Sequence, residues 1–201
     1  ISQLFLGAAM NVTPNLAVGA QMIYYFGALS RNSNVLFDTD FTMRDINTGW
    51  DYDMNSMGAK VGVQYFNDIA ANTRLTVGAT YRFATNLDGN YTRFATVEMN
   101  GTPVDTISMD AVENYKVEIP SELAFGVSVR KKDKWMFGID YVRQNWSDSF
   151  FGETPGVDFK PETSSSIRAG FEFIPNRYDI RYYLKRATYR LGAYYDKTYI
   201  N

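Results

Sequence analysis

The sequence of 201 residues contains no cysteine and no histidine. Without cysteine there are no disulfides or thiolate metal ligands, and without histidine the side chain most often used as a general base near neutral pH is missing. No run of about 18 apolar residues occurs, so the sequence offers no candidate transmembrane helix. The net charge of −2 provides no basic field for nucleic acid. We therefore expect no enzymatic activity, no metal or other cofactor and no nucleic-acid partner.

The sequence does contain a short pattern that is repeated along its length: an apolar residue, a glycine and a second apolar residue. Each copy lies where apolar residues alternate with small or polar ones, which is the period of a β-strand with one apolar face. The glycine always belongs to the other face. The eight copies centre on Gly7, Gly19, Gly62, Gly78, Gly126, Gly138, Gly170 and Gly192. Eight such strands predict an all-β fold, an antiparallel transmembrane β-barrel, in which a mean hydropathy as low as −0.29 is expected because only every second residue faces lipid.

The connections between these strands alternate between short and long. The short ones, residues 11–15, 67–73, 131–134 and 175–186, carry turn-forming Pro, Asn and Asp. The long ones, about 30–56, 86–115 and 147–164, are rich in Asn, Asp, Gly, Thr and Ser. Outer-membrane barrels have short periplasmic turns and long extracellular loops, so we predict a bacterial outer-membrane protein with its short turns in the periplasm. Aromatic residues near both sets of connections are typical of membrane-interface belts, although β-strands favour aromatics in any setting.

Both ends of the sequence fall on the predicted extracellular side, because the first strand enters a short turn and the eighth strand leaves one. A complete outer-membrane barrel normally keeps both termini in the periplasm. We therefore expect residues 1–201 to form a single β-barrel region that is an internal part of a larger barrel.

Three segments carry a resemblance to a known family. They are Trp135–Trp146 with the preceding turn Arg130–Lys134, the run Asn176–Tyr195, and the hairpin Asn11–Ala20. They resemble the FadL/OmpP1/TodX family, in particular its Bacteroidetes branch of outer membrane transport proteins. The resemblance implies a 14-stranded barrel with an N-terminal plug that carries hydrophobic molecules across the outer membrane. On that basis this chain supplies the middle eight strands, and the plug and the final strands lie outside it.

Charged residues occupy the polar face of the predicted strands, which would line the barrel lumen. A Lys or Arg that faced lipid near the membrane midplane would cost roughly 2–4 kcal/mol, so the inward placement is favoured. An inward Arg can hold a carboxylate through a bidentate hydrogen bond, and the alternative is that cations and carboxylates neutralise each other. The candidate substrate-binding cations are Lys60, Arg82, Arg130, Arg168 and Arg190, and the candidate lumen charge network consists of Glu122, Asp140 and Glu172.

Two further charged clusters lie in the connections. The first long connection holds Asp38, Asp40, Asp45, Asp51 and Asp53, which can be read as a Ca²⁺ site or as a solvated acidic loop; no EF-hand spacing is present. The last short connection holds Arg177, Arg181, Lys185 and Arg186, which can reach lipid headgroups or remain solvated.

These observations predict an outer-membrane channel for passive uptake of hydrophobic small molecules such as long-chain fatty acids. The first alternative is a non-transport barrel of the same superfamily that serves as a subunit or carrier in type IX protein secretion. A small structural eight-stranded barrel and a soluble lipid-binding barrel are less consistent with the chain ends and the connection lengths, respectively. The expected partners are outer-membrane lipids and lipopolysaccharide, a hydrophobic ligand, and other outer-membrane or secretion proteins.

Overall fold

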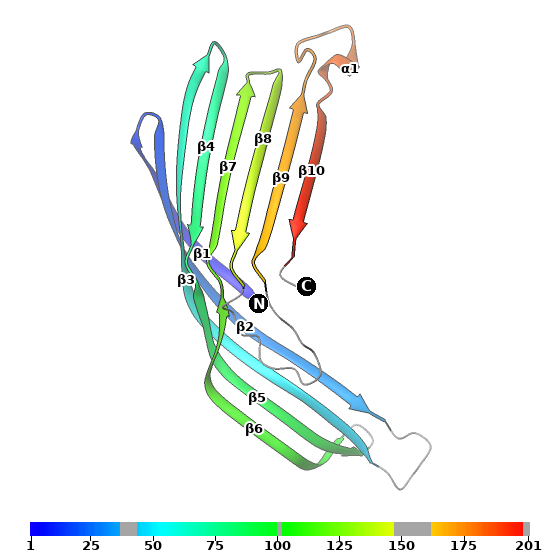
Figure 1. The fold of residues 1–201 in the computed structure, drawn as a ribbon. Helices are drawn as coiled ribbons and strands as arrows, with labels where there is room; N and C mark the ends of the chain where they lie inside the picture. The colour runs from blue at the N-terminus through cyan, green and yellow to red at the C-terminus, as the bar shows by residue number, and fades with distance from the viewer. Residues whose placement is uncertain (37–43, 100–101, 147–161, 199–201) are drawn as a thin grey trace. The chain divides into compact units, whose positions relative to one another are not determined.

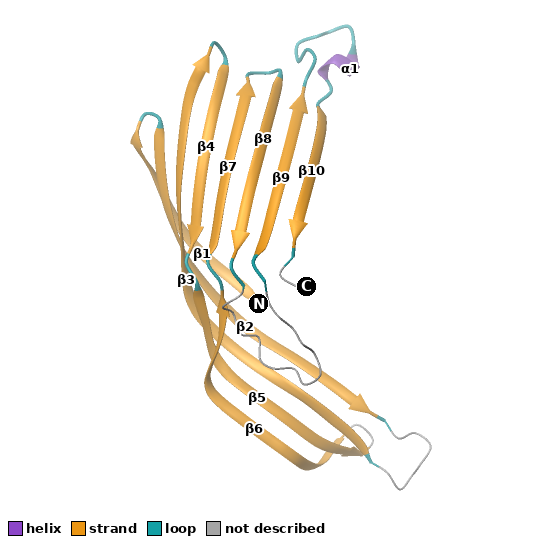
Figure 2. Cartoon of the chain, viewed as in Figure 1, coloured by secondary structure: helices purple, strands orange, loops and turns teal. Residues whose placement is uncertain are grey.

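The computed structural model describes residues 1–36, 44–99, 102–146 and 162–198. These residues form ten β-strands and one short helix, so the all-β prediction is confirmed (Figure 2). In the described part of the chain, no helix has the length and apolarity needed to cross a membrane. The elements are β1 (Ser2–Thr13), β2 (Leu16–Val35), β3 (Asp45–Ala70), β4 (Thr73–Arg82), β5 (Thr85–Met99), β6 (Thr102–Ile119), β7 (Glu122–Lys131), β8 (Trp135–Gln144), β9 (Ser164–Phe173), α1 (Tyr183–Arg186) and β10 (Tyr189–Lys197).

The strands belong to one sheet in which eight neighbours follow the order β1-β2-β3-β4-β7-β8-β9-β10. These eight are the strands predicted from the glycine pattern, and Figure 1 shows β4, β7, β8, β9 and β10 side by side. The pairs β3–β4, β4–β7, β7–β8, β8–β9 and β9–β10 are all antiparallel. The remaining strands, β5 and β6, lie off this path, with β5 paired to β3 and to β6.

The chain divides into two compact units, which we describe separately. Unit 1 consists of residues 1–4, 23–57 and 86–118, and unit 2 consists of residues 5–22, 58–85 and 119–201. Unit 2 therefore holds all of β4, β7, β8, β9 and β10, together with parts of β1, β2 and β3.

In unit 2 the apolar face of the sheet is exposed. Its large side chains keep roughly two fifths of their surface or more accessible, including Val63 on β3, Phe125 on β7, Ile139 on β8 and Phe171 on β9. An apolar face of this extent is what a lipid-facing barrel wall presents. The register also aligns aromatic residues next to the short turns, because Phe173 pairs with Trp135 on one side and with Tyr189 on the other. The predicted belt at this end is therefore a continuous row across three strands.

Unit 1 corrects the prediction that residues 30–56 and 86–115 are loops. Strand β2 continues to Val35, β3 already begins at Asp45, and β5 and β6 fill most of the second connection. The Asn, Asp and Gly content suggested loops, but Tyr52 and Met54 alternate with Asp51 and Asp53 at the strand period. Backbone hydrogen bonding between strands does not depend on side-chain polarity, so a polar segment can still pair. The third long connection, 147–164, lies mostly outside the described residues.

Unit 1 has a small core of its own. Ile23, Tyr25, Tyr52, Met54 and Leu87 are its buried apolar residues, and the Tyr52 hydroxyl donates a hydrogen bond to the Leu87 carbonyl oxygen at 2.5 Å. Next to it, the rings of Tyr91 and Tyr115 stack with their centroids 5.0 Å apart. This core packs β5 and β6 against β3 and makes the extension a folded part of the sheet.

Candidate functional site on the polar face of unit 2

A hollow of about 880 Å³ lies on the polar face of unit 2. Its floor includes Gly19, Gly62, Gly78 and Gly126, and the last two are direct partners across β4 and β7. Because glycine has no side chain, these positions leave the backbone uncovered and make room above the sheet. A hollow of this size is in the range that accommodates a small organic ligand.

A row of four polar side chains crosses the sheet beside this hollow. Lys60 on β3 pairs in register with Arg82 on β4, Arg82 with Glu122 on β7, and Glu122 with Gln144 on β8. The Glu122 carboxylate lies 3.6 Å from the Lys60 ammonium and 3.5 Å from the Arg82 guanidinium, and it accepts a hydrogen bond from the Gln144 amide at 2.5 Å. The tertiary fold thus brings together two of the predicted cations and one of the predicted carboxylates.

The row carries more positive charge than negative charge, because one carboxylate serves two cations. The Arg82 side chain is only 18% exposed, and its Nε atom is buried without a hydrogen-bond partner among the described residues. A buried donor without an acceptor costs free energy, so this guanidinium retains the capacity to bind a further acceptor.

Two other predicted residues pair at the opposite end of the strands. Arg190 on β10 and Glu172 on β9 are register partners, and the Arg190 Nε donates to the Glu172 carboxylate at 2.8 Å. Arg130 on β7 contacts the sulfur of Met136 at 3.0 Å, and Met136 is in turn the register partner of Glu172. The cations at this end therefore contact neighbouring strands.

Asp140 and Arg168 behave differently from the other predicted residues. They are register partners on β8 and β9, yet they form no ion pair within the part of the chain that the structure describes. The Asp140 carboxylate instead lies over Gly126, in the space that a side chain at that position would need. Both Asp140 and Arg168 line the hollow. Arg168 is thus the predicted cation that is most available to a bound anion.

Sequence reasoning missed two members of this site, Gln144 and Met136. Both lie on the polar face, in alternation with the outward Phe137 and Tyr141, so the strand period could have placed them there. Neither side chain carries a charge, so the cost of placing a charge in lipid, which assigns Lys and Arg to the lumen, does not single them out. The partners that they contact, Glu122 and Arg130, could not be read from the strand period.

The acidic cluster does not form the loop that was expected. Asp45, Asp51 and Asp53 lie within β3, whereas Asp38 and Asp40 lie outside the described residues. Among the residues that the structure describes, no group of three or more Asp, Glu, His or Cys could hold a metal ion. Asp45, Asp51 and Asp53 are therefore residues of a β-strand and not of a loop.

Two solved structures have a similar fold. The toluene transporter TbuX of Ralstonia pickettii has 22% sequence identity and a TM-score of 0.57, and the match covers 97% of this chain and 56% of the transporter. The toluene transporter TodX of Pseudomonas putida has 16% identity and a TM-score of 0.51, and the match covers 97% of this chain and 54% of the transporter. This chain therefore spans about half the length of either transporter. No curated protein matches it.

The fold and the exposed apolar wall define a protein of the outer-membrane β-barrel class. The family model for BamG matches residues 1–201, and the chain belongs to the BamG family. The resemblance to FadL/OmpP1/TodX is thus confirmed at the level of the fold, while the matching family is BamG. Neither the family nor the two solved structures are named for an enzymatic activity.

Proposed function

We propose that the full-length protein is a non-transporting barrel subunit of the BAM complex in the bacterial outer membrane. The observation that carries this proposal is the match of the BamG family over all 201 residues, because the family name suggests association with that complex. The proposal keeps the non-transport role that the sequence offered as an alternative, but it replaces type IX secretion with the BAM complex.

The arrangement of charges on the polar face supports a structural role. Lys60 and Arg82 are neutralised in part by Glu122, and Arg190 is neutralised by Glu172. Charges that pair across neighbouring strands hold the sheet in register and are less available to a passing solute. A barrel that serves as a subunit needs a stable wall, and these pairs provide it.

The test is to purify the tagged full-length protein from its native outer membrane in a mild detergent. We expect BAM subunits to co-purify in fixed stoichiometry, and depletion of the protein to lower the amounts of other outer-membrane barrels. A protein that purifies alone, and whose depletion changes no other barrel, would contradict the proposal.

A second function, passive uptake of hydrophobic molecules, is supported by a separate observation. The hollow of about 880 Å³ lies beside Arg168, and the two solved structures of similar fold are toluene transporters. In this reading Arg168 holds the carboxylate of a ligand such as a long-chain fatty acid, and Lys60, Arg82, Arg130 and Arg190 are further candidates for substrate binding. The carboxylates of Asp140, Glu122 and Glu172 offset part of the positive charge of these cations.

Fatty-acid binding to the full-length protein separates the two functions. If the second function holds, Arg168→Ala weakens binding by about 1.5–3 kcal/mol, the range for hydrogen bonds to charged groups. The exposed Arg93 on β5 provides a matched control, and Arg93→Ala leaves binding unchanged. If both variants bound the fatty acid equally well, Arg168 would not be part of its binding site, and the subunit role would be favoured.

We also propose that residues 1–201 are one barrel region of a longer chain. The resemblance to the Bacteroidetes branch of the FadL/OmpP1/TodX family supports a complete barrel of 14 strands with an N-terminal plug. The exposed apolar face of unit 2 would then contact outer-membrane lipids and lipopolysaccharide. Determination of the full-length structure tests the strand number directly.

A further inference from the structure

Two neighbouring turns of unit 2 concentrate positive charge at one end of the sheet. Lys131 ends β7 and is followed by residues 132–134, which lead into β8. Residues 174–188 join β9 to β10 and include α1, and β8 pairs with β9 (Figure 1). We call these two segments the basic turn patch. It contains seven cations and two carboxylates, whereas the whole chain has a net charge of −2. The cations are Lys131, Lys132, Lys134, Arg177, Arg181, Lys185 and Arg186, and the carboxylates are Asp133 and Asp179.

Both carboxylates are already engaged inside the patch. Asp133 pairs with Arg177 at 3.0 Å and accepts a hydrogen bond from the Tyr178 hydroxyl at 3.2 Å, which ties the two turns together. Asp179 lies 3.4 Å from the Lys185 ammonium. The other five cations form no ion pair within the described residues. Their charge is therefore available to an anionic partner.

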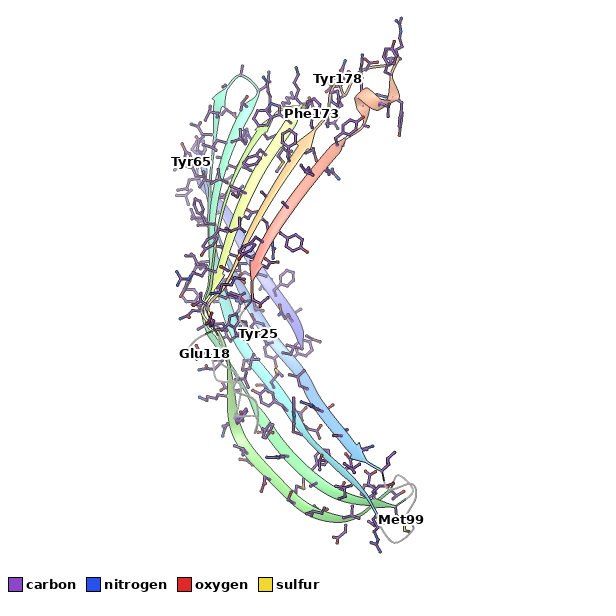
Figure 3. All side chains as sticks on the ribbon, turned by 45° about the vertical axis from the view of Figure 1, so that its right-hand side comes forward. Tyr25, Tyr65, Met99, Glu118, Phe173 and Tyr178 are labelled. Atoms are coloured by element: carbon purple, nitrogen blue, oxygen red, sulfur yellow. The ribbon has the colours of Figure 1, made fainter. Side chains whose placement is uncertain are left out.

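The segment of residues 174–188 also exposes large apolar side chains. Ile180 is 98% exposed, and Tyr178, Tyr183 and Leu184 each keep more than two thirds of their surface accessible. The patch begins where the aromatic row of Trp135, Phe173 and Tyr189 ends, and Figure 3 shows Tyr178 beyond Phe173. The Tyr189 hydroxyl donates to the Leu184 carbonyl oxygen at 3.0 Å, so α1 is attached to that row. The exposed apolar side chains are thus held next to the predicted membrane interface.

Cations and aromatic rings also contact each other within the patch. The Lys185 ammonium lies 4.5 Å from the centre of the Tyr182 ring, and the Arg186 guanidinium lies 5.6 Å from that of Tyr183. Long cationic side chains that extend along apolar groups and end in a charge are suited to the boundary between acyl chains and headgroups. Clusters of Lys and Arg beside a membrane bind anionic lipids, with each cation adding to the affinity.

We propose that the basic turn patch binds the phosphate headgroups of anionic phospholipids in the membrane leaflet next to the short turns. Arg181, Arg186 and Lys132 hold the phosphate, while Ile180 and Leu184 enter the apolar layer beneath it. Five cations of the patch have no ion-pair partner among the described residues, and their complementarity to an anionic headgroup carries the proposal. The exposed apolar side chains favour a lipid over an acidic protein. The proposal is independent of whether the barrel is a BAM subunit or a channel.

The experiment titrates the full-length protein in a nonionic detergent with phosphatidylglycerol or with phosphatidylcholine of the same acyl chains, and native mass spectrometry counts the bound lipid. We expect wild-type protein to prefer phosphatidylglycerol. The variant with Lys132→Gln, Arg181→Gln and Arg186→Gln leaves the ion pairs of Asp133 and Asp179 intact. Since each cation contributes about fivefold, this variant should lose affinity for phosphatidylglycerol on the order of 100-fold.

The control variant carries Arg31→Gln, Arg44→Gln and Arg93→Gln, three exposed positions outside the patch with the same change in charge. It should bind phosphatidylglycerol as the wild type does. If the triple patch variant does not fold, Arg181→Gln and Arg186→Gln are measured singly, and added salt should weaken the lipid binding of the wild type.

Three outcomes would overturn the proposal. Wild-type protein could bind both lipids equally, or the patch variant could retain its phosphatidylglycerol affinity. Alternatively, an acidic protein could co-purify with the wild type and be lost from the patch variant while lipid binding stays constant. Inorganic phosphate serves as a further probe, and displacement of the lipid by millimolar phosphate would indicate a site for the free anion.

Discussion

Glu122 lies directly opposite Arg82 in the register of β7 and β4, with 3.5 Å between the carboxylate and the guanidinium. The same carboxylate reaches the Lys60 ammonium on β3 and accepts a hydrogen bond from Gln144 on β8. A single side chain thus connects four strands of the main path. Without its charge, Lys60 and Arg82 would be adjacent cations on paired strands, an arrangement that is destabilising.

Replacing Glu122 by Gln should therefore lower the stability of the barrel. Glutamine keeps the size of the side chain but removes the charge that both cations share, so we expect a loss of about 1.5–3 kcal/mol in the free energy of unfolding. Urea unfolding of the full-length protein in detergent measures it. Glu113→Gln on the exposed part of β6 is the matched control and should have little effect. Equal stabilities for the two variants would show that the row of polar side chains around Glu122 does not stabilise the barrel.

Replacing Val63 by Arg should impair insertion into a bilayer, because Val63 is 43% exposed on the apolar face of β3. An Arg near the midplane of the lipid-facing surface costs roughly 2–4 kcal/mol. Gly78 lies on the opposite face, and a Cβ there would meet the Val63 carbonyl oxygen at an ordinary 3.7 Å. Folding assays in lipid vesicles should show Gly78→Arg tolerated better than Val63→Arg. Equal insertion of the two variants would contradict the assignment of Val63 to the lipid-facing side of the sheet and of Gly78 to the opposite side.

Labelling of introduced cysteines should reveal the orientation of the barrel, because this sequence contains no cysteine of its own. We expect Ser108→Cys on the exposed strand β6 to react with a membrane-impermeant maleimide on intact cells. Asn72→Cys in the turn between β3 and β4 should react only after the outer membrane is opened. The reverse pattern would place the short turns outside the cell.

The hydrogen bonds that Asp179 accepts in the turn that carries α1 should weaken in acid. The backbone N–H of Tyr182 is the largest of the effects that lower the pKa of Asp179 below its usual 3.8, and the N–H of Arg181 and the Lys185 ammonium add to it against the opposing effect of desolvation. Since the folded pKa lies below the unfolded one, the stabilisation by Asp179 is complete above about pH 3.8. It disappears as the pH falls through the lower, folded value.

Hydrogen exchange of the Arg181 and Tyr182 amides measures this effect in the full-length protein. Protection, corrected for the intrinsic exchange rate, should fall below pH 3.8 in the wild type. Asp179→Asn retains an oxygen acceptor without a titratable proton, so its protection should not change across the same range. A wild-type profile as flat as that of the variant would contradict the assignment.

The sequence alone determined which side of each strand is apolar. Alternation has a period of two residues and is a local property, so Val63, Phe125 and Ile139 could be placed on one face and Gly62 and Gly126 on the other before any fold was known. It also located the eight strands of the main path, because each carries its own copy of the glycine pattern. The lengths of β2 and β3 were underestimated because their ends in unit 1 are rich in Asn and Asp.

Only the tertiary structure decided which charges meet. The strand period places Lys60, Arg82 and Glu122 on one face but does not set the register between strands, and residues 60 and 122 are far apart in the chain. Register follows from backbone pairing between strands, and that pairing leaves Arg168 beside the hollow while Arg190 reaches Glu172. In the same way, the cations of two separate turns became one basic patch because β8 pairs with β9 and Arg177 reaches Asp133. Local alternation therefore fixes the faces of a sheet, whereas contacts within a face depend on pairings between distant parts of the chain.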